Sequence, residues 1–257
     1  FQLFVYLGQT PAGFLYPLVH NYEPDYYWYL SLIRQGFDGS LFVTSRYTPE
    51  LFKPQFVNTF FPFFGLIARG IGVTPGFMYT LARVFFGSSL LVVGFLLSSE
   101  LFKEKKERWI AFLFMIFGAP FWYNDGGVIK QVGEFWTGFD PLMRLSWLPH
   151  HLAANTFLIL TLIAWIKFQK AKSSGCLAVF IFMSAIIAGW LHPASGMVLV
   201  FMAFGMMIFF PRQRFGSMIV GIGAVLPLVF LYLLTNSVFP WTAFRDWERF
   251  VAYPVDP

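Results

Sequence analysis

The stretch PGFMYTLARVFFGSSLLVVGFLLSS, from Pro75 to Ser99, is apolar almost throughout, and Arg83 is its one charged residue. A helix needs about 20 consecutive apolar residues to cross a bilayer, and this stretch is long enough. Other apolar runs follow it without the alternation of about ten-residue segments that marks a transmembrane β-barrel. The sequence therefore predicts an all-α, polytopic bundle, with membrane helices at about 75–99, 109–123, 150–167, 175–191, 195–210 and 215–236.

The composition of the whole chain supports this class. Of its 257 residues, 57% are hydrophobic and only 12% are charged, whereas soluble domains carry roughly 25% charged residues. The net charge of +5 comes from basic residues in short loops between apolar runs, which indicates membrane topology and not nucleic-acid binding. Cys176 is the one cysteine, so a disulfide framework is excluded.

The two ends of the sequence do not read as natural ends. The chain begins with Phe1, its first apolar run covers only residues 1–7, and Pro257 closes it without a terminal signal. We expect residues 1–257 to form a single transmembrane domain that is truncated at both ends.

Basic loops predict the orientation in the membrane. Lysine and arginine residues cluster at 103–108, 167–172 and 212–214, and such loops face the cytoplasm. The helices from 75 onward then alternate correctly, and the loop 8–74 lies outside. In that loop, the run QFVNTFFPFFGLIARGIG at 55–72 becomes an interfacial helix instead of a span. We expect a multi-pass protein of the plasma or inner membrane whose chemistry faces the extracytoplasmic side.

An acidic pair, Glu23 and Asp25, stands in the run HNYEPDYYWY of the first external loop. Pro24 fixes its own φ and favours an extended Glu23, so we expect the two acids not to share one face of a helix. Asp25 is expected to cap a helix that begins at Tyr26. Two interpretations stay open, namely an ordinary N-cap and a general base whose pKa is raised beside the apolar phase.

Three histidines and two arginines are further candidates for substrate binding. His150 and His151 open one helix and point about 100° apart, so metal binding by that pair alone is weak. His192 ends another helix on the same side, and a phosphate- or sugar-binding role competes with that of plain interfacial residues. Arg83 either snorkels to the headgroups or donates to a lipid phosphate, and Arg144 has the same two interpretations.

The region 8–98 resembles the membrane glycosyltransferases of GT-C type, which include protein O-mannosyltransferases and aminoarabinose transferases. Glu23-Pro24-Asp25 looks like the acidic motif of their first external loop, and Tyr26-Tyr27-Trp28-Tyr29 like the first juxtamembrane helix. Lys53-Pro54-Gln55 looks like the start of the second juxtamembrane helix, and Tyr79 to Arg83 like the opening of the next membrane helix. The proline inside the acidic motif departs from the Asp-Glu form.

The resemblance implies an inverting transfer of a sugar from a polyprenyl-phosphate donor to an acceptor glycan, lipid or protein. Asp25 would be the catalytic base, and Glu23 would support it or bind a divalent cation with it. Arg83 would stabilise the departing phosphate.

Two functions of other classes remain open from the residues alone. One is a transporter or flippase for a lipid-linked or anionic solute, although transporters place polar groups near the midplane of the membrane. The other is a non-catalytic membrane subunit whose loops bind a partner.

Overall fold

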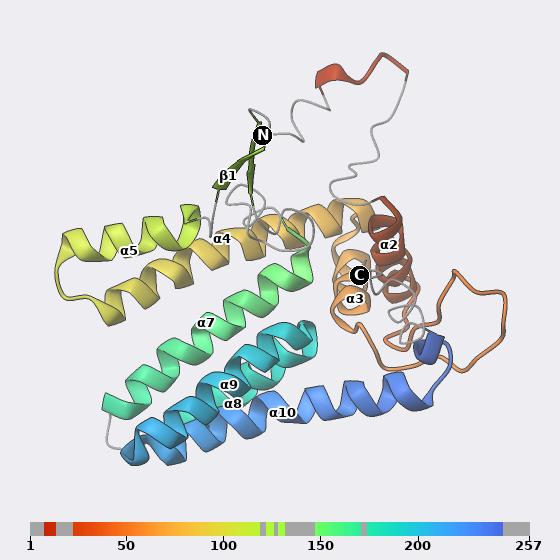
Figure 1. Ribbon diagram of the computed structural model, residues 1–257. Coiled ribbons are helices and arrows are strands. Elements are labelled where there is room, and N and C mark those ends of the chain that lie inside the picture. Colours follow the sequence, from red (N-terminus) through yellow and green to blue (C-terminus); the bar gives the residue numbers. More distant parts are fainter. Residues whose placement is uncertain are drawn as a thin grey trace. The chain divides into compact units, whose positions relative to one another are not determined.

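The computed structural model confirms the all-α prediction. It describes residues 8–13, 23–118, 122–125, 128–131, 147–170 and 174–243. Helices dominate these ranges, and the one sheet among them is the antiparallel hairpin of β1 (Trp122–Asp125) and β2 (Val128–Gln131) (Figure 1). The chain divides into two compact units, residues 1–84 and 85–257, and the boundary falls inside helix α4 (Pro75–Leu101).

Three of the described helices are long and apolar enough to cross a membrane, and they mark the chain as a membrane protein. They are α4, α7 (Pro149–Lys170) and α10 (Arg214–Ser237). Helices α8 (Gly175–Leu191) and α9 (Pro193–Phe209) are apolar but have 17 residues each. At 1.5 Å per residue they reach about 26 Å, a little short of the ~30 Å hydrocarbon core.

The helix predicted at 109–123 has the wrong bounds. Helix α5 spans Lys105–Phe117, so it begins one turn earlier and ends six residues sooner. Its start includes basic residues because Arg108 folds back and donates to the carbonyl oxygens of Phe102 and Lys103, both at 2.9 Å. Gly118 ends it in an extended conformation, and Trp122 already belongs to β1.

The first unit is built on a close pair of short helices, α2 (Glu23–Phe37) and α3 (Phe60–Ile71). Gly36 of α2 lies directly against the carbonyl oxygen of Pro62, and Gly65 of α3 lies against that of Ile33. A side chain at either glycine would overlap the opposite backbone. The helix predicted within 55–72 is therefore present, and its packing partner is α2.

Hydrogen bonds from the Gln35 side chain and between two loop backbones hold the loop that connects α2 to α3. The Gln35 side chain donates from Nε2 to the carbonyl oxygen of Thr44 at 3.0 Å, and its Oε1 accepts from the Thr44 N–H at 2.9 Å. Val43 and Gln55 pair through two backbone hydrogen bonds of 2.9 Å. The buried amide of Gln35 thus satisfies a loop backbone that would otherwise lack partners.

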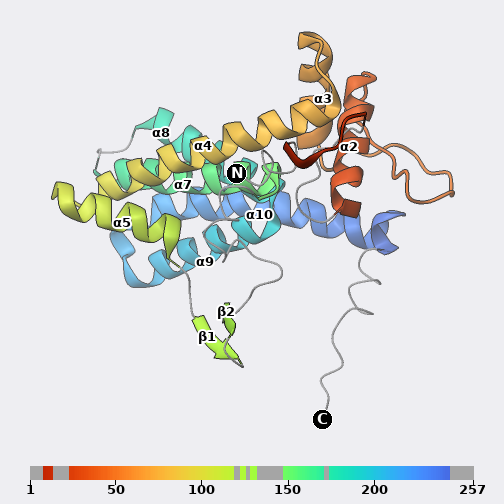
Figure 2. The same cartoon turned by 90° about the horizontal axis from the view of Figure 1, so that it is seen from above.

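The second unit has a core formed by α7, α8, α9 and α10, which lie side by side in both views (Figures 1 and 2). Small residues allow close contact, because Ala185, Ala188, Ala203 and Ala224 are all fully buried. Inside it, Thr161 Oγ1 lies 2.8 Å from both Ser184 Oγ and the Phe157 carbonyl oxygen, and its one hydrogen can serve either acceptor. The Ser184 hydroxyl donates to the Ile181 carbonyl of its own helix, which is a usual way to satisfy hydroxyls in an apolar bundle.

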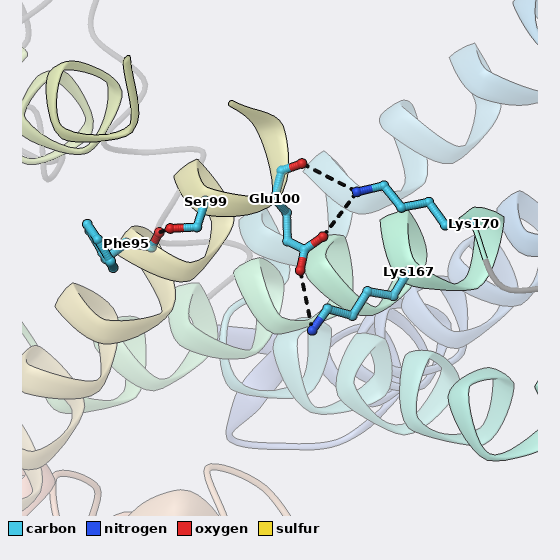
Figure 3. Close-up of polar contacts among 5 residues, drawn as sticks. All are labelled: Phe95, Ser99, Glu100, Lys167 and Lys170. Atoms are coloured by element: carbon cyan, nitrogen blue, oxygen red, sulfur yellow. Dashed lines mark hydrogen bonds and ion pairs between the residues drawn. The ribbon is translucent and has the colours of Figure 1, made fainter. Parts of the chain in front are cut away.

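The part of α4 in the second unit packs against α5 and α7. Leu90, Val93 and Leu97 of α4 form an apolar cluster with α7. At the end of α4, the Glu100 carboxylate pairs with Lys167 at 3.4 Å and Lys170 at 3.1 Å (Figure 3). The two lysines therefore tie the last turn of α7 to the last turn of α4.

Candidate active site

The acidic motif lies in the first turn of α2, and this corrects the predicted start of the helix. The helix begins at Glu23 and not at Tyr26, so Asp25 lies inside its first turn and is not its N-cap. Pro24 is accommodated because its fixed φ suits the first turn of a helix, where its missing N–H has no partner in any case. Residues two apart project about 200° from each other, so Glu23 and Asp25 still occupy different faces.

Asp25 is half-buried, and burial raises the pKa of its carboxyl above the usual value of 3.8. A carboxylate that loses hydration holds its proton more tightly and is a stronger base once ionised. The helix N-terminus acts in the opposite sense, since it favours negative charge in the first turn. Burial is the cause of the raised pKa at Asp25.

Three tyrosines lie within the electrostatic reach of Asp25. These are Tyr29, one turn further along α2, Tyr47 of the following loop and Tyr79 of α4. Burial, followed by the negative charge of Asp25, raises the pKa of Tyr29 and of Tyr47. These phenols therefore stay protonated at neutral pH and can act as hydrogen-bond donors.

Aromatic rings of α2, close to Asp25 in the sequence, pack against rings of α3 and α4. Tyr29 stacks on Phe61 of α3 with ring centroids 4.3 Å apart and 17° between the planes. Tyr26 meets Tyr79 edge to face at 5.1 Å and 89°. Tyr26 and Tyr79 are each only 1% exposed. These contacts join α2, α3 and the first turns of α4 inside the first unit.

The hydroxyl of Tyr79 is buried and makes no hydrogen bond to any residue that the structure describes. A buried hydroxyl in this state costs roughly 1–3 kcal/mol. A group of a bound substrate would remove that cost. Tyr79 is thus a donor held in place beside a carboxylate.

Arg83 lies one turn after Tyr79, and its charge acts on the Tyr79 phenol. Only 7% of Arg83 is exposed. A guanidinium this deep in a helix long enough to span a membrane is costly, which makes Arg83 a candidate for function. The first unit therefore contains a carboxylate, Asp25, and a guanidinium, Arg83, that both act electrostatically on the neutral Tyr79 phenol.

The three predicted histidines come together in the second unit. The rings of His151 and His192 lie 4.1 Å apart at 32°, and His150 stands perpendicular to His151 at 4.4 Å and 90°. Burial lowers the pKa of His192 below 6.5. The sequence missed their polar partners, namely Trp147, Asn155 and Ser195. The spacings of Trp147–His151 and His151–Asn155, four residues each, were the available signal.

Some predicted site residues cannot be placed. Arg144 lies outside the described residues, and of Glu23 the structure describes the backbone but not the side chain. A divalent cation was the other role expected for the acidic motif. Mg²⁺ and Ca²⁺ take several oxygen ligands, and no group of three or more His, Cys, Asp or Glu side chains in the described ranges could hold a metal ion. The described donors thus do not make up a cation site.

Comparison of the chain with protein-family models, with curated proteins and with solved structures finds no match.

Proposed function

We propose that this chain is a multi-pass membrane glycosyltransferase that moves a sugar from a polyprenyl-phosphate donor to a hydroxyl acceptor. The observation that carries the proposal is the placement of Asp25. It is a half-buried carboxylate with a raised pKa, and its charge acts on the Tyr79 phenol. The Tyr79 hydroxyl is buried and has no hydrogen-bond partner among the described residues. Arg83, on the same helix as Tyr79, supplies a nearby positive charge.

The reaction divides between a base and a cation. Asp25 would accept the proton of the acceptor hydroxyl while the acceptor oxygen forms a bond to C1 of the sugar. The bond from C1 to the phosphate oxygen breaks on the opposite face, and the electron pair leaves with the phosphate. This single displacement inverts the anomeric centre, in agreement with the expected inverting class.

Arg83 and Tyr79 would receive the leaving group. Negative charge grows on the phosphate oxygen in the transition state, and a guanidinium forms charge-assisted hydrogen bonds with phosphate. The Tyr79 hydroxyl would donate a further hydrogen bond that it lacks within the described residues. Because both groups are buried, their interaction with the phosphate is weakly screened by solvent.

The orientation follows from the charges. Lys103 to Arg108, Lys167 to Lys172 and Arg212 to Arg214 would face the cytoplasm. Asp25 then works on the extracytoplasmic side, where α2 and α3 lie at the interface. Tyr and Trp side chains of α2 suit that depth of the membrane.

Turnover of the donor by purified protein tests the proposal. The full chain in detergent is incubated with polyprenyl-phosphate-linked [14C]mannose, glucose or galactose and a membrane extract as acceptor, and release of polyprenyl phosphate is measured. We expect release from at least one donor and a drop of about 100-fold or more in Asp25→Asn, the usual contribution of a positioned base.

The Asp25→Asn change keeps the size of the side chain, and Asp38→Asn is the matched control. Asp38 is exposed and paired with Arg34 at 3.1 Å, so its loss should leave turnover intact. Equal turnover in Asp25→Asn and the wild type would sink the catalytic assignment. Movement of the intact donor across vesicles without its cleavage would instead support a flippase.

A further inference from the structure

The second unit contains a polar site of its own. It consists of His151 and Asn155 of α7, His192 between α8 and α9, Ser195 of α9, and Trp147 just before α7. We call it the histidine-pair site. Its hydrogen bonds determine where each imidazole carries its proton.

The Ser195 hydroxyl fixes the tautomer of His192. It donates its one hydrogen to Asn155 Oδ1 at 3.1 Å. The contact of 3.0 Å between Ser195 Oγ and His192 Nδ1 must then use a hydrogen from the ring. His192 therefore carries its proton on Nδ1, and its Nε2 is a bare acceptor.

The indole of Trp147 fixes the opposite tautomer in His151. Trp147 Nε1 can only donate, and it lies 3.1 Å from His151 Nδ1. Nδ1 of His151 therefore accepts, and the neutral ring carries its proton on Nε2. The two rings, with centroids 4.1 Å apart, thus offer one donor and one acceptor.

The same bonds argue against one familiar use of Ser195 and one of His151. Ser195 gives its hydrogen to an amide and not to a histidine, so it is not activated as a nucleophile. His151 would have to break its bond to Trp147 before Nε2 could bind a metal. No described residue hydrogen-bonds Nε2 of either His151 or His192.

We infer that the histidine-pair site binds an uncharged, hydroxyl-bearing ligand of the sugar class. A hydroxyl group is both donor and acceptor, so one hydroxyl, or two neighbouring ones, can accept from His151 Nε2 and donate to His192 Nε2. A fully ionised anion such as sulfate has no hydrogen to donate to His192 and would need that ring to be protonated. The inference does not depend on the reaction proposed for Asp25.

Few charges surround the pair. Among the described residues, the titratable groups that interact with the pair are the two rings themselves and His150, which is perpendicular to His151. Helices α8 and α9 carry no Asp, Glu, Lys, Arg or His. Cys176, the titratable residue of α8, lies at the opposite end of that helix. A proton on His192 thus finds no carboxylate on these elements to stabilise it.

Histidine NMR tests both the tautomers and the ligand. The full chain is labelled with 15N-histidine in detergent micelles, and glucose or sulfate is added to about 100 mM, a range that covers the weak affinity of a two-contact site. We expect opposite tautomers for His151 and His192 at pH 7.5, and a saturable shift of both with glucose. The glucose response should fall as His192 is protonated.

Two variants sharpen the result. Ser195→Ala keeps both rings and frees the His192 tautomer, so glucose binding should weaken at least several-fold while the protein stays folded. His20→Gln is the control for the loss of a histidine elsewhere and should leave the response unchanged. The inference is overturned if glucose causes no shift, or if sulfate alone binds and binds more tightly at lower pH. Neither result bears on Asp25.

Discussion

The ring of Tyr26 meets the ring of Tyr79 edge to face, with centroids 5.1 Å apart. Tyr26 is the residue directly after Asp25, and Tyr79 is one turn before Arg83. This contact therefore joins the turn of α2 that carries Asp25 to the turn of α4 that precedes Arg83, within the first unit. Asp25 and Arg83 are 58 positions apart in the sequence, and an aromatic pair brings their helices together.

Loss of the Tyr79 hydroxyl should lower turnover of the donor without lowering the stability of the fold. Tyr79→Phe removes a buried hydroxyl without a described partner, so we expect a thermal midpoint equal to or above that of the wild type. If the hydroxyl contacts the donor phosphate, turnover should fall about tenfold, the effect of one hydrogen bond of about 1.4 kcal/mol. Tyr26→Phe is the control. A lowered midpoint in Tyr79→Phe would show that its hydroxyl has a structural partner.

The glycines between α2 and α3 should be intolerant of alanine. Gly65→Ala puts a methyl group into the backbone of α2, and we expect a loss of about 1–3 kcal/mol, the range for overpacked sites. Gly70→Ala lies on the same helix with open space around it, and it should be neutral or stabilising by up to about 1 kcal/mol. Thermal unfolding in detergent measures both. Equal midpoints would contradict the close packing of the two helices.

Asp25→Asn should stabilise the folded protein at neutral pH. Because the folded pKa lies above the usual 3.8, ionised Asp25 costs stability once the pH rises through that raised pKa. Below 3.8 the carboxyl is protonated in both states and the cost disappears. We expect a higher midpoint for Asp25→Asn at pH 7 and equal midpoints at pH 3.5. A lower midpoint for the variant at pH 7 would mean that partners, and not burial, dominate at Asp25.

His192 should make the protein sensitive to acid. Burial holds its folded pKa below 6.5, so the unfolded chain binds the proton first as the pH falls. Its contribution to stability is complete above pH 6.5 and is lost as the pH falls through the lowered pKa. The difference in thermal midpoint between wild type and His192→Gln should shrink from pH 7.5 to pH 5. A constant difference would place the pKa at its ordinary value.

The native cysteine can report the orientation of the chain. Cys176 is exposed and lies four residues after Lys172. If the 167–172 loop is cytoplasmic, an impermeant maleimide added to intact cells should not label Cys176, and a permeant one should. In Cys176→Ser with Ser40→Cys, the impermeant reagent should label the exposed position 40 of the first loop. The reverse labelling pattern would put Asp25 on the cytoplasmic side.

Much of the helical architecture could be predicted because apolar length is a local property. The runs at 75–99, 150–167 and 215–236 became α4, α7 and α10 with ends shifted by at most three residues. The prediction was wrong at α5 and at the start of α2, because these ends depend on capping contacts and on the tolerance of a first turn for proline. The candidate residues Asp25, Arg83 and His192 were found by their rarity in an apolar chain.

The sequence by itself determined the class of the protein, since so few charges and such long apolar runs suit only a membrane helix bundle. It also determined where acids and histidines stand along the chain. Only the tertiary structure decided which of them meet. It set Asp25 within electrostatic reach of Tyr79. It also brought the rings of His151 and His192 to 4.1 Å from each other. Contacts between residues about 40 or more positions apart depend on how rings and glycines pack, and no local pattern encodes that packing.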